Sequence, residues 1–298
     1  MKIRTTIIPV TSVILFVTSI VADIHSQRKD TDARLSMYYY RHMCQKRKII
    51  DTADIRVLYA FNALDIQDKN TWIDEGQLKI AKGFAQYSSH FEEVQEDSLA
   101  QWLNDHPKAS AHPTYVWLQG DVHERWIEYQ YSNIHVKDGI LEEWAAMPQE
   151  IDEDNLVYSE TLPLQKWKTE NETKTICGYT CMKATCTWRG RGYTAWYSPQ
   201  IPVPYGPWKF GGLPGLIMAV SDATGEYSWE AVAVNKGSFP IFAPRRKKYT
   251  RSTREKVLKL QRQLNEDYIK TTGAVVFDHK TGQPIFTRKH KYTPLELE

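Results

Sequence analysis

Residues 181–199 read CMKATCTWRGRGYTAWYSP, and this stretch has the pattern of a β-hairpin. The residues Arg189–Gly192 form a glycine-rich turn, and the flanking segments carry the β-branched and aromatic side chains that suit strands. Turn residues recur every eight to twelve positions from Thr175 to Val234, which is the strongest β signal in the chain. We therefore expect the centre of the fold to be an antiparallel sheet.

The hairpin leads into a proline-rich loop and then a glycine-rich motif. Four prolines break regular structure within nine residues: Pro199, Pro202, Pro204 and Pro207. The motif that follows is Gly212, Leu213, Pro214, Gly215, Leu216 and Ile217. A phosphate-binding loop is not expected, because a strand rather than a helix follows and Pro214 lacks an N–H donor. We predict a structural role for the motif: a tight bend that lets the tryptophan-containing loop pack over a curved sheet.

The rest of the chain adds strands and a few helices. Apolar residues alternate at Ile55, Val57, Tyr59 and Phe61, and a second strand pattern begins at Leu78 and Ile80. We expect a brief helix over residues 97–104 and a helical turn over 140–147. Only one long helix is indicated, beginning with a capping box at Ser252 and Glu255 and continued by Val257, Leu260, Leu264 and Tyr268.

These patterns predict an α+β fold that is mainly antiparallel β. We expect a curved or half-barrel sheet with a few helices packed on one face, because strands outnumber helices and no βα alternation is present.

The first residues have the features of an export signal. Lys2 and Arg4 precede a nearly uninterrupted apolar run over residues 7–22, and polar sequence follows Ser26. This pattern is typical of a secretory leader, and the run is short for an uncleaved membrane anchor, which is the alternative. We expect a signal peptide over 1–26, a single sheet-rich domain over 27–298, and a location in the periplasm, at the outer membrane or outside the cell.

Composition narrows the class of protein. Apolar residues make up 42% and charged residues 25% of the 298 residues, as in an ordinary globular chain. The 38 basic and 36 acidic residues nearly cancel, so no global field favours nucleic acid as a partner. Four cysteines, Cys44, Cys177, Cys181 and Cys186, are too few for a disulfide scaffold. In a straight strand Cys177 and Cys181 lie too far apart to bond, so pairing needs either a bend at Gly178 or the approach of Cys44.

The central third of the sequence resembles a known family. The GLPGLI family of secreted bacterial proteins is named for the motif at residues 212–217, and the resemblance also covers Ile176–Ala184, Arg189–Tyr197, Ile201–Pro204 and Gly206–Phe210. The family is largely uncharacterised. It is similar to the bowl-shaped N-terminal domain of some secreted peptide:N-glycanases, which implies a curved sheet without an assigned reaction. Cys177 and Cys186 depart from the family pattern, so any disulfide that they form would be particular to this chain.

Motifs for catalysis or metal binding are absent from the sequence. Neither Gly-x-Ser-x-Gly nor the zinc-protease helix motif occurs, and the cysteine spacing matches no common zinc site. Adjacent acids such as Glu142 and Glu143 usually mark a solvated face. We expect no catalytic residue, no metal and no cofactor.

Two groups of residues are candidate binding sites. Aromatic side chains gather around the proline-rich loop: Trp188, Trp196, Tyr197, Tyr205 and Trp208. They predict a ligand pocket bordered by Trp196 and Trp208, although aromatic clusters more commonly form a plain core. Residues 245–262 contain nine basic residues and one acid, led by Arg245, Arg246, Lys247 and Lys248. This second group predicts either a solvated helix face or contact with an anionic membrane surface.

The function expected from these features is a non-catalytic envelope protein. It would bind an apolar or peptide-like ligand, or an envelope partner, through its curved sheet. Two alternatives stay open: a secreted hydrolase acting on peptides or glycans, and a structural or assembly component of an outer-membrane or secretion complex.

Overall fold

The computed structural model describes residues 47–108, 131–148, 155–244, 248–274, 276–277, 281–287, 289 and 291–298. The predicted signal peptide, Cys44 and Arg245–Lys247 lie outside these ranges. The chain divides into two compact units, of which one comprises residues 1–46 and 95–115 and the other residues 47–94 and 116–298. The prediction of a single domain over 27–298 therefore stays a prediction.

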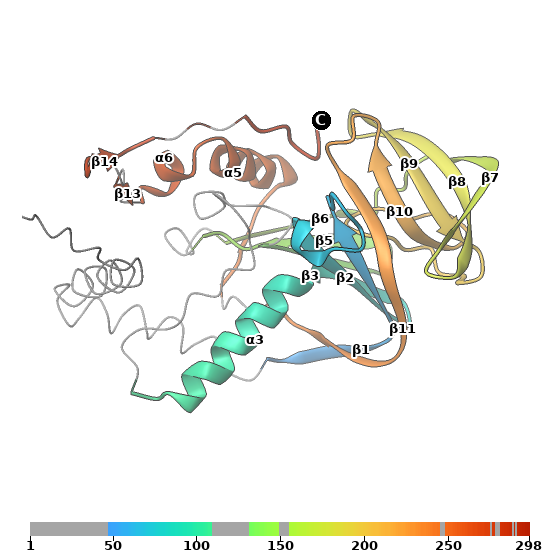
Figure 1. Ribbon diagram of the computed structural model, residues 1–298, viewed down its shortest axis with the longest axis horizontal. Coiled ribbons are helices and arrows are strands. Elements are labelled where there is room, and N and C mark those ends of the chain that lie inside the picture. The colour runs from blue at the N-terminus through green and yellow to red at the C-terminus, as the bar shows by residue number, and fades with distance from the viewer. Residues whose placement is uncertain are drawn as a thin grey trace, which may run out of the picture. The chain divides into compact units, whose positions relative to one another are not determined.

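Twelve strands form one open sheet in the larger unit (Figure 1). The order is β12-β6-β5-β4-β3-β2-β1-β11-β10-β9-β8-β7, and every neighbouring pair is antiparallel except β12 with β6. The strands on the β7 side are β7 (Lys168–Ile176), β8 (Tyr179–Trp188), β9 (Arg191–Ser198), β10 (Leu216–Asp222), β11 (Ser228–Phe242) and β1 (Ile49–Phe61). The others are β2 (Asp74–Ala81), β3 (Phe84–Ser89), β4 (Ser132–Lys137), β5 (Ile140–Ala145), β6 (Leu156–Thr161) and β12 (Thr250–Arg251). The predicted α+β, mainly antiparallel class is confirmed; because the sheet is open, a half-barrel describes it only loosely.

Two long strands, β1 and β11, join the two sides of the sheet. They run side by side as bent ribbons, and their register shifts at three points along β1. Such bulges bend a strand and increase its twist. The predicted hairpin forms as β8 and β9, joined by Arg189 and Gly190, whose φ angles of 51° and 74° give the two left-handed residues of a tight hairpin turn.

Helix α5 (Arg254–Glu266) packs on the sheet through three buried residues at helical spacing, Val257, Gln261 and Leu264. Its cap is Thr253, whose side chain accepts a hydrogen bond from the Lys256 N–H, so the predicted capping box at Ser252 is wrong by one residue. The remaining elements of this unit are η1 (Lys69–Thr71), α6 (Tyr268–Thr272), β13 (Val276–Phe277) and β14 (Pro284–Ile285). No helix in the described ranges has the length and apolar content needed to cross a bilayer.

Two helix predictions are corrected. Residues 140–145 form β5 rather than a helical turn, and their alternating burial shows one face inside and one outside. The helix expected over 97–104 is α3 (His90–Asp105), which is longer than α5. Its buried residues are only Leu99 and Leu103, so the sequence carries little apolar periodicity over its first two turns.

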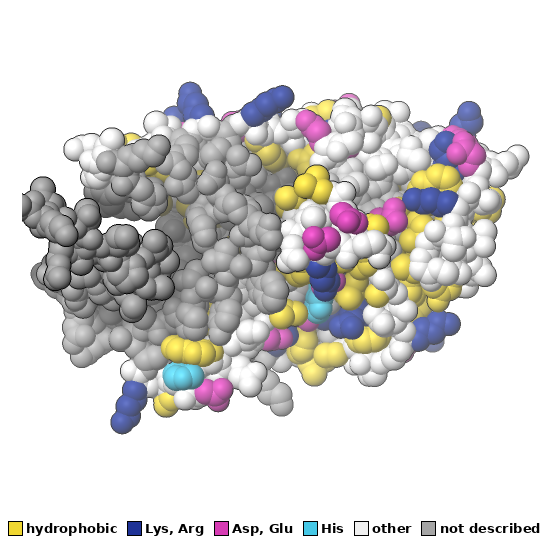
Figure 2. All heavy atoms as spheres, in the orientation of Figure 1, with side chains coloured by type: hydrophobic (Ala, Val, Ile, Leu, Met, Phe, Trp, Pro, Cys, Tyr) yellow, Lys and Arg dark blue, Asp and Glu magenta, His cyan; other side chains and the backbone are white. Residues whose placement is uncertain are grey.

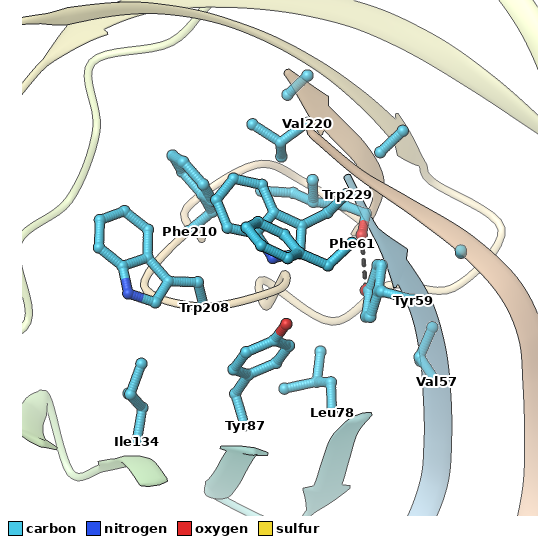
Figure 3. Close-up of a cluster of buried hydrophobic side chains, with 14 of the residues drawn as sticks. Val57, Tyr59, Phe61, Leu78, Tyr87, Ile134, Trp208, Phe210, Val220 and Trp229 are labelled. Atoms are coloured by element: carbon cyan, nitrogen blue, oxygen red, sulfur yellow. Dashed lines mark hydrogen bonds between the residues drawn. The ribbon is translucent and has the colours of Figure 1, made fainter. Parts of the chain in front are cut away.

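Aromatic rings from distant segments make the core of the larger unit. Trp208 and Phe210, from the loop before β10, point toward Trp229 of β11 and Phe61 of β1 (Figure 3). The rings of Trp208 and Trp229 are stacked with centroids 6.1 Å apart. The loop is therefore part of the core and is fixed to the sheet.

Candidate functional site

The GLPGLI motif and the residue before it form a bend with no room for a Cβ at two of its glycines. A Cβ at Gly215 would lie 2.3 Å from the carbonyl oxygen of Ser198, and one at Gly211 would lie 2.7 Å from that of Pro204. Gly212 has a φ of 83°, which L residues rarely adopt. Leu213, Leu216 and Ile217 are buried in the core, so the bend returns the chain from the loop into β10.

The aromatic residues proposed as a ligand site do not share one location. The ring of Trp188 packs edge-on against Trp208, with centroids 5.5 Å apart, and Trp208 is only 6% exposed. Side chains alternate along β9, so Trp196 lies on the opposite face from Tyr197, under the ammonium group of Lys174 at 5.0 Å. Tyr197 is buried, and Tyr205 borders a small cavity of about 20 Å³ beside Trp208. Trp208 lines this cavity and Trp196 does not.

A cluster of buried charges lies directly behind Trp208 and was missed by sequence reasoning. The ammonium group of Lys209 contacts Oε2 of Glu143 at 2.7 Å, the hydroxyl of Tyr158 at 2.8 Å and the carboxylate of Glu296. The side chains of these three charged residues are at most 3% exposed. The cluster joins the loop before β10 to β5, β6 and the segment 291–298.

Further polar groups satisfy Glu143. Its Oε1 accepts hydrogen bonds from Ser132 at 2.6 Å and from Gln261 at 3.0 Å, and its Oε2 accepts one from Tyr158 at 2.9 Å. Gln261 comes from α5, so the helix contributes a hydrogen bond to the cluster as well as apolar packing. With Lys209 included, both oxygens of the carboxylate are fully engaged.

Glu296 is held by two further cations. Arg254 at the start of α5 donates to its Oε2 from both Nε, at 2.8 Å, and Nη2. Arg189 in the turn between β8 and β9 approaches the same oxygen at 3.3 Å and also pairs with Glu160 at 2.8 Å. Three cations therefore surround this one carboxylate.

The charges set the protonation states in the cluster. Burial by itself would raise the pKa of Glu143, but the ammonium group of Lys209 and the surrounding hydrogen bonds lower it to about 2. Burial would lower the pKa of Lys209, but the carboxylates of Glu143 and Glu296 hold it well above its usual value. Burial and the charge of Glu143 raise the pKa of Tyr158. At neutral pH the cluster is thus two carboxylates, one ammonium and a neutral phenol, and none of these groups titrates near pH 7.

A cavity of about 330 Å³ opens beside this cluster. Its floor is formed by Ser132, Glu143 and Lys209, and one wall by helix α5 through Arg254, Leu258 and Arg262. The opposite wall is the segment from Tyr292 to Glu298. Its volume lies at the lower end of the range for small-molecule sites.

Glu143 is not placed to act as a general acid or base. A general acid or base needs a pKa near the working pH and a free lone pair or proton directed at the substrate. Glu143 has neither, because its pKa is about 2 and its oxygens are engaged by four donors. The ion pairs of Lys209 with Glu143 and Glu296 instead hold β5 and the segment 291–298 in place around the cavity.

The sequence contains one signal that would have found Glu143. In a strand, neighbouring residues point to opposite faces, so one of the pair Glu142 and Glu143 must be buried if residues 140–145 are a strand. The prediction of a helical turn removed that inference. Nothing in the sequence connects Lys209 to Glu296, which lies 87 positions later.

The remaining predicted residues are placed only in part. Of the basic group, Lys248 is exposed, while Arg245, Arg246 and Lys247 lie outside the described residues. On the face drawn in Figure 2, side chains of both charge signs are mixed among the described residues. No disulfide joins the three described cysteines, Cys177, Cys181 and Cys186, to one another. The alternative that involves Cys44 lies outside the described residues.

Comparisons with known proteins give a match over the central segment and a weak likeness to solved structures. Two crystal forms of PNGF-II, a peptide:N-glycanase, align with 72% of the chain at TM-scores of 0.49 and 0.48, with 12% and 13% sequence identity. The chain spans about a third of the length of these structures, 34% and 33%. No curated protein matches the chain.

A family model described as a protein of unknown function, Porph_ging, matches residues 189–219. The matched segment begins at the β8–β9 turn, contains Arg189, Arg191 and Lys209, and ends within β10. The resemblance to the GLPGLI family, a family of unknown function, is thereby confirmed for the segment that supplies the buried cations of the site.

Proposed function

We propose that this chain is an exported, non-catalytic envelope protein that binds a small apolar or peptide-like ligand in the cavity beside Lys209. Export rests on the leader pattern over residues 1–26, with its basic start and apolar run. The ligand class rests on the lining of the cavity. Apolar groups from Trp208, Leu258 and Leu297 alternate there with charged and amide groups.

The observation that carries the proposal is the position of the cavity over a fully engaged charge cluster. A solid core would leave no space there, and a catalytic site would leave a titrating group free. Instead, walls of mixed apolar and charged groups meet a floor of fixed dipoles and charges, which can orient a ligand without reacting with it. A hydrolase would need a free nucleophile or base in the cavity, and Glu143 is engaged by four donors.

The test fills the cavity without disturbing the charges. Leu258 lies on the cavity side of α5, so Leu258→Trp places a large ring in the space. Lys256 is exposed on the same helix and does not line the cavity, so Lys256→Trp is the matched control. The probe is N-phenyl-1-naphthylamine, a neutral apolar dye whose fluorescence rises in apolar surroundings.

We expect the wild type and Lys256→Trp to bind the dye with the same affinity and Leu258→Trp to bind it at least 10-fold more weakly. Circular dichroism and urea unfolding check that both variants are folded. Equal binding by all three proteins, or none by the wild type, would refute the assignment of the cavity.

A further inference from the structure

The segment from Thr293 to Glu298 contacts the sheet in the manner of a bound peptide. We propose that the groove beneath it is a docking site for an extended acidic peptide, and that this segment is its occupant in cis. The inference rests on the proposed function, because the acidic side chain of the occupant forms part of the cavity beside Lys209.

Side chains of the sheet bind the backbone of this segment residue by residue. Arg191 donates to the carbonyl of Pro294 from Nη2 at 2.6 Å and from Nε at 3.2 Å. The hydroxyl of Tyr193 donates to the carbonyl of Leu295 at 3.3 Å, and that of Tyr227 to the carbonyl of Thr293. Three successive carbonyls are thus satisfied by side chains rather than by a neighbouring strand. Such contacts recognise an extended backbone whatever its sequence.

The turn between β8 and β9 provides the other contacts to the backbone. The N–H of Leu297 donates to the carbonyl of Arg189 at 3.1 Å. At Gly190, an added Cβ would lie 2.8 Å from the Cβ of Leu297, so a larger residue there would displace the segment. The hairpin turn is shaped to let a second chain segment lie against it.

Two side chains of the segment supply specificity. Leu295 is only 4% exposed and belongs to the hydrophobic core. Glu296 enters the charge cluster, where Lys209, Arg254 and Arg189 surround its carboxylate. An apolar residue followed by an acidic one is therefore the pattern that this groove selects.

Charge balance supports an exchangeable acidic occupant. With the segment in place, the cavity lining has four basic residues and four acidic ones, of which Glu296 and Glu298 belong to the segment. Without the segment, Lys209, Arg254, Lys259 and Arg262 would face only Glu143 and Glu255. On its cavity side the empty groove would therefore carry two more basic residues than acidic ones, and this side would attract an acidic side chain.

The groove also coincides with the segment that matches the family model. Arg189, Arg191, Tyr193 and Lys209, which make most of these contacts, all lie within residues 189–219. The segment 293–298 lies outside that match. Most of the groove contacts thus come from the segment that the family model matches.

The test separates the segment from the sheet without removing it during folding. A protease recognition sequence is inserted directly after Phe286, whose side chain is 77% exposed, and the folded protein is then cleaved. A fluorescein-labelled peptide with the sequence of residues 292–298, YTPLELE, is added in excess. Fluorescence anisotropy and native mass spectrometry follow its exchange with the cleaved fragment. The uncleaved insertion variant is the control for occupancy in cis.

We expect the cleaved protein to stay folded and to exchange its fragment for the labelled peptide, while the uncleaved protein binds the peptide at least 10-fold more weakly. A peptide with glutamine in place of Glu296 should bind at least 10-fold more weakly than the parent. A peptide with glutamine in place of the exposed Glu298 should lose less affinity than the Glu296→Gln peptide, because Arg254 contacts residue 298 through a backbone oxygen.

Unfolding on cleavage, retention of the fragment without exchange, or equal binding of the parent peptide and the Glu296→Gln peptide would overturn the docking proposal. The dye titration on the same cleaved protein separates the two proposals. Dye binding that Leu258→Trp still blocks, without peptide exchange, leaves the cavity assignment intact and removes only the docking site.

Discussion

Replacing Lys209 with methionine should reverse the pH dependence of stability that the buried cluster creates. The change removes the ammonium group and keeps most of the side-chain volume. It leaves the carboxylates of Glu143 and Glu296 buried, with Glu143 no longer facing a cation. Breaking a buried ion pair by removing one partner costs about 3–5 kcal/mol.

The pKa of Glu143 gives an independent magnitude. Its fall from 4.5 to about 2 corresponds to about 3 kcal/mol of stabilisation at neutral pH, at roughly 1.4 kcal/mol per pKa unit. This contribution is fully present above pH 4.5 and is lost as the pH falls toward 2, because the folded state resists protonation that the unfolded state accepts. Without Lys209, burial raises the pKa of Glu143 instead. The variant should then lose stability as the pH rises through that raised pKa.

The assay is urea unfolding followed by tryptophan fluorescence at pH 8, 6 and 4.5. We expect Lys209→Met to lower the free energy of unfolding by about 3–5 kcal/mol at pH 8 and by clearly less at pH 4.5. The double variant Lys209→Met/Glu143→Gln should recover part of the loss, because it removes the unpaired charge. As a control, Lys183→Met, which breaks an exposed pair with Glu170 and Glu172, should change stability little at every pH. If Lys209→Met lowers the free energy of unfolding by less than about 1 kcal/mol at pH 8, or by an amount that does not vary with pH, the variant does not leave a buried and unpaired charge at Glu143.

Three further outcomes follow from the described part of the chain. Burial lowers the pKa of His135 to about 4, so the free energy of unfolding of the wild type should fall by about 3 kcal/mol between pH 6.5 and 4 as the unfolded state takes up a proton. In urea titrations His135→Gln should remove this fall, and an unchanged pH profile would contradict the prediction. Gly215→Ala forces a Cβ to within 2.3 Å of a backbone oxygen and should cost about 3 kcal/mol or more, whereas Gly192→Ala, with its Cβ 3.5 Å from the nearest neighbour, should cost less than about 1.5 kcal/mol by calorimetry. Maleimide labelling at pH 7.5 should modify the exposed Cys177 before the buried Cys181, whose pKa burial raises to about 11; peptide mass spectrometry gives the order, and the reverse order would contradict the burial.

The sequence predicts the elements whose signals lie within a few neighbouring residues. The hairpin of β8 and β9, the alternation in β1 and the apolar spacing in α5 each depend on residues within a few positions of one another. The same holds for the motif at 212–217, where glycine beside proline indicates a bend. In each case a period or a turn residue carries the information.

The site could not be predicted in the same way, because its chemistry depends on long-range contacts. Glu143 looks like a solvated acid until Lys209, 66 positions later, and Gln261, 118 positions later, are placed against it. The predicted aromatic group treats neighbours in sequence as neighbours in space, but strand alternation separates Trp196 from the buried rings. Reading 140–147 as a helical turn hid the one local clue, which is the buried face of β5.

The backbone at Trp208 connects the family motif to the charge cluster. Trp208 has a φ of 51°, a conformation that costs a residue with a bulky side chain about 1–3 kcal/mol. The ring nevertheless packs against both Trp188 and Trp229, and the next residue places its ammonium group between Glu143 and Glu296. In an extended strand, consecutive side chains point to opposite faces of the sheet. Trp208 and Lys209 could then not reach the aromatic core and the charge cluster from the same side. The left-handed residue allows Trp208 to fill the core while Lys209 reaches the cluster on that side. The glycines at 206, 211 and 215, which leave room for Ile217, Pro204 and Ser198, hold the loop in the position where this is possible. The glycines before and within the motif therefore both bend the chain and hold Lys209 where its ammonium group reaches the cluster.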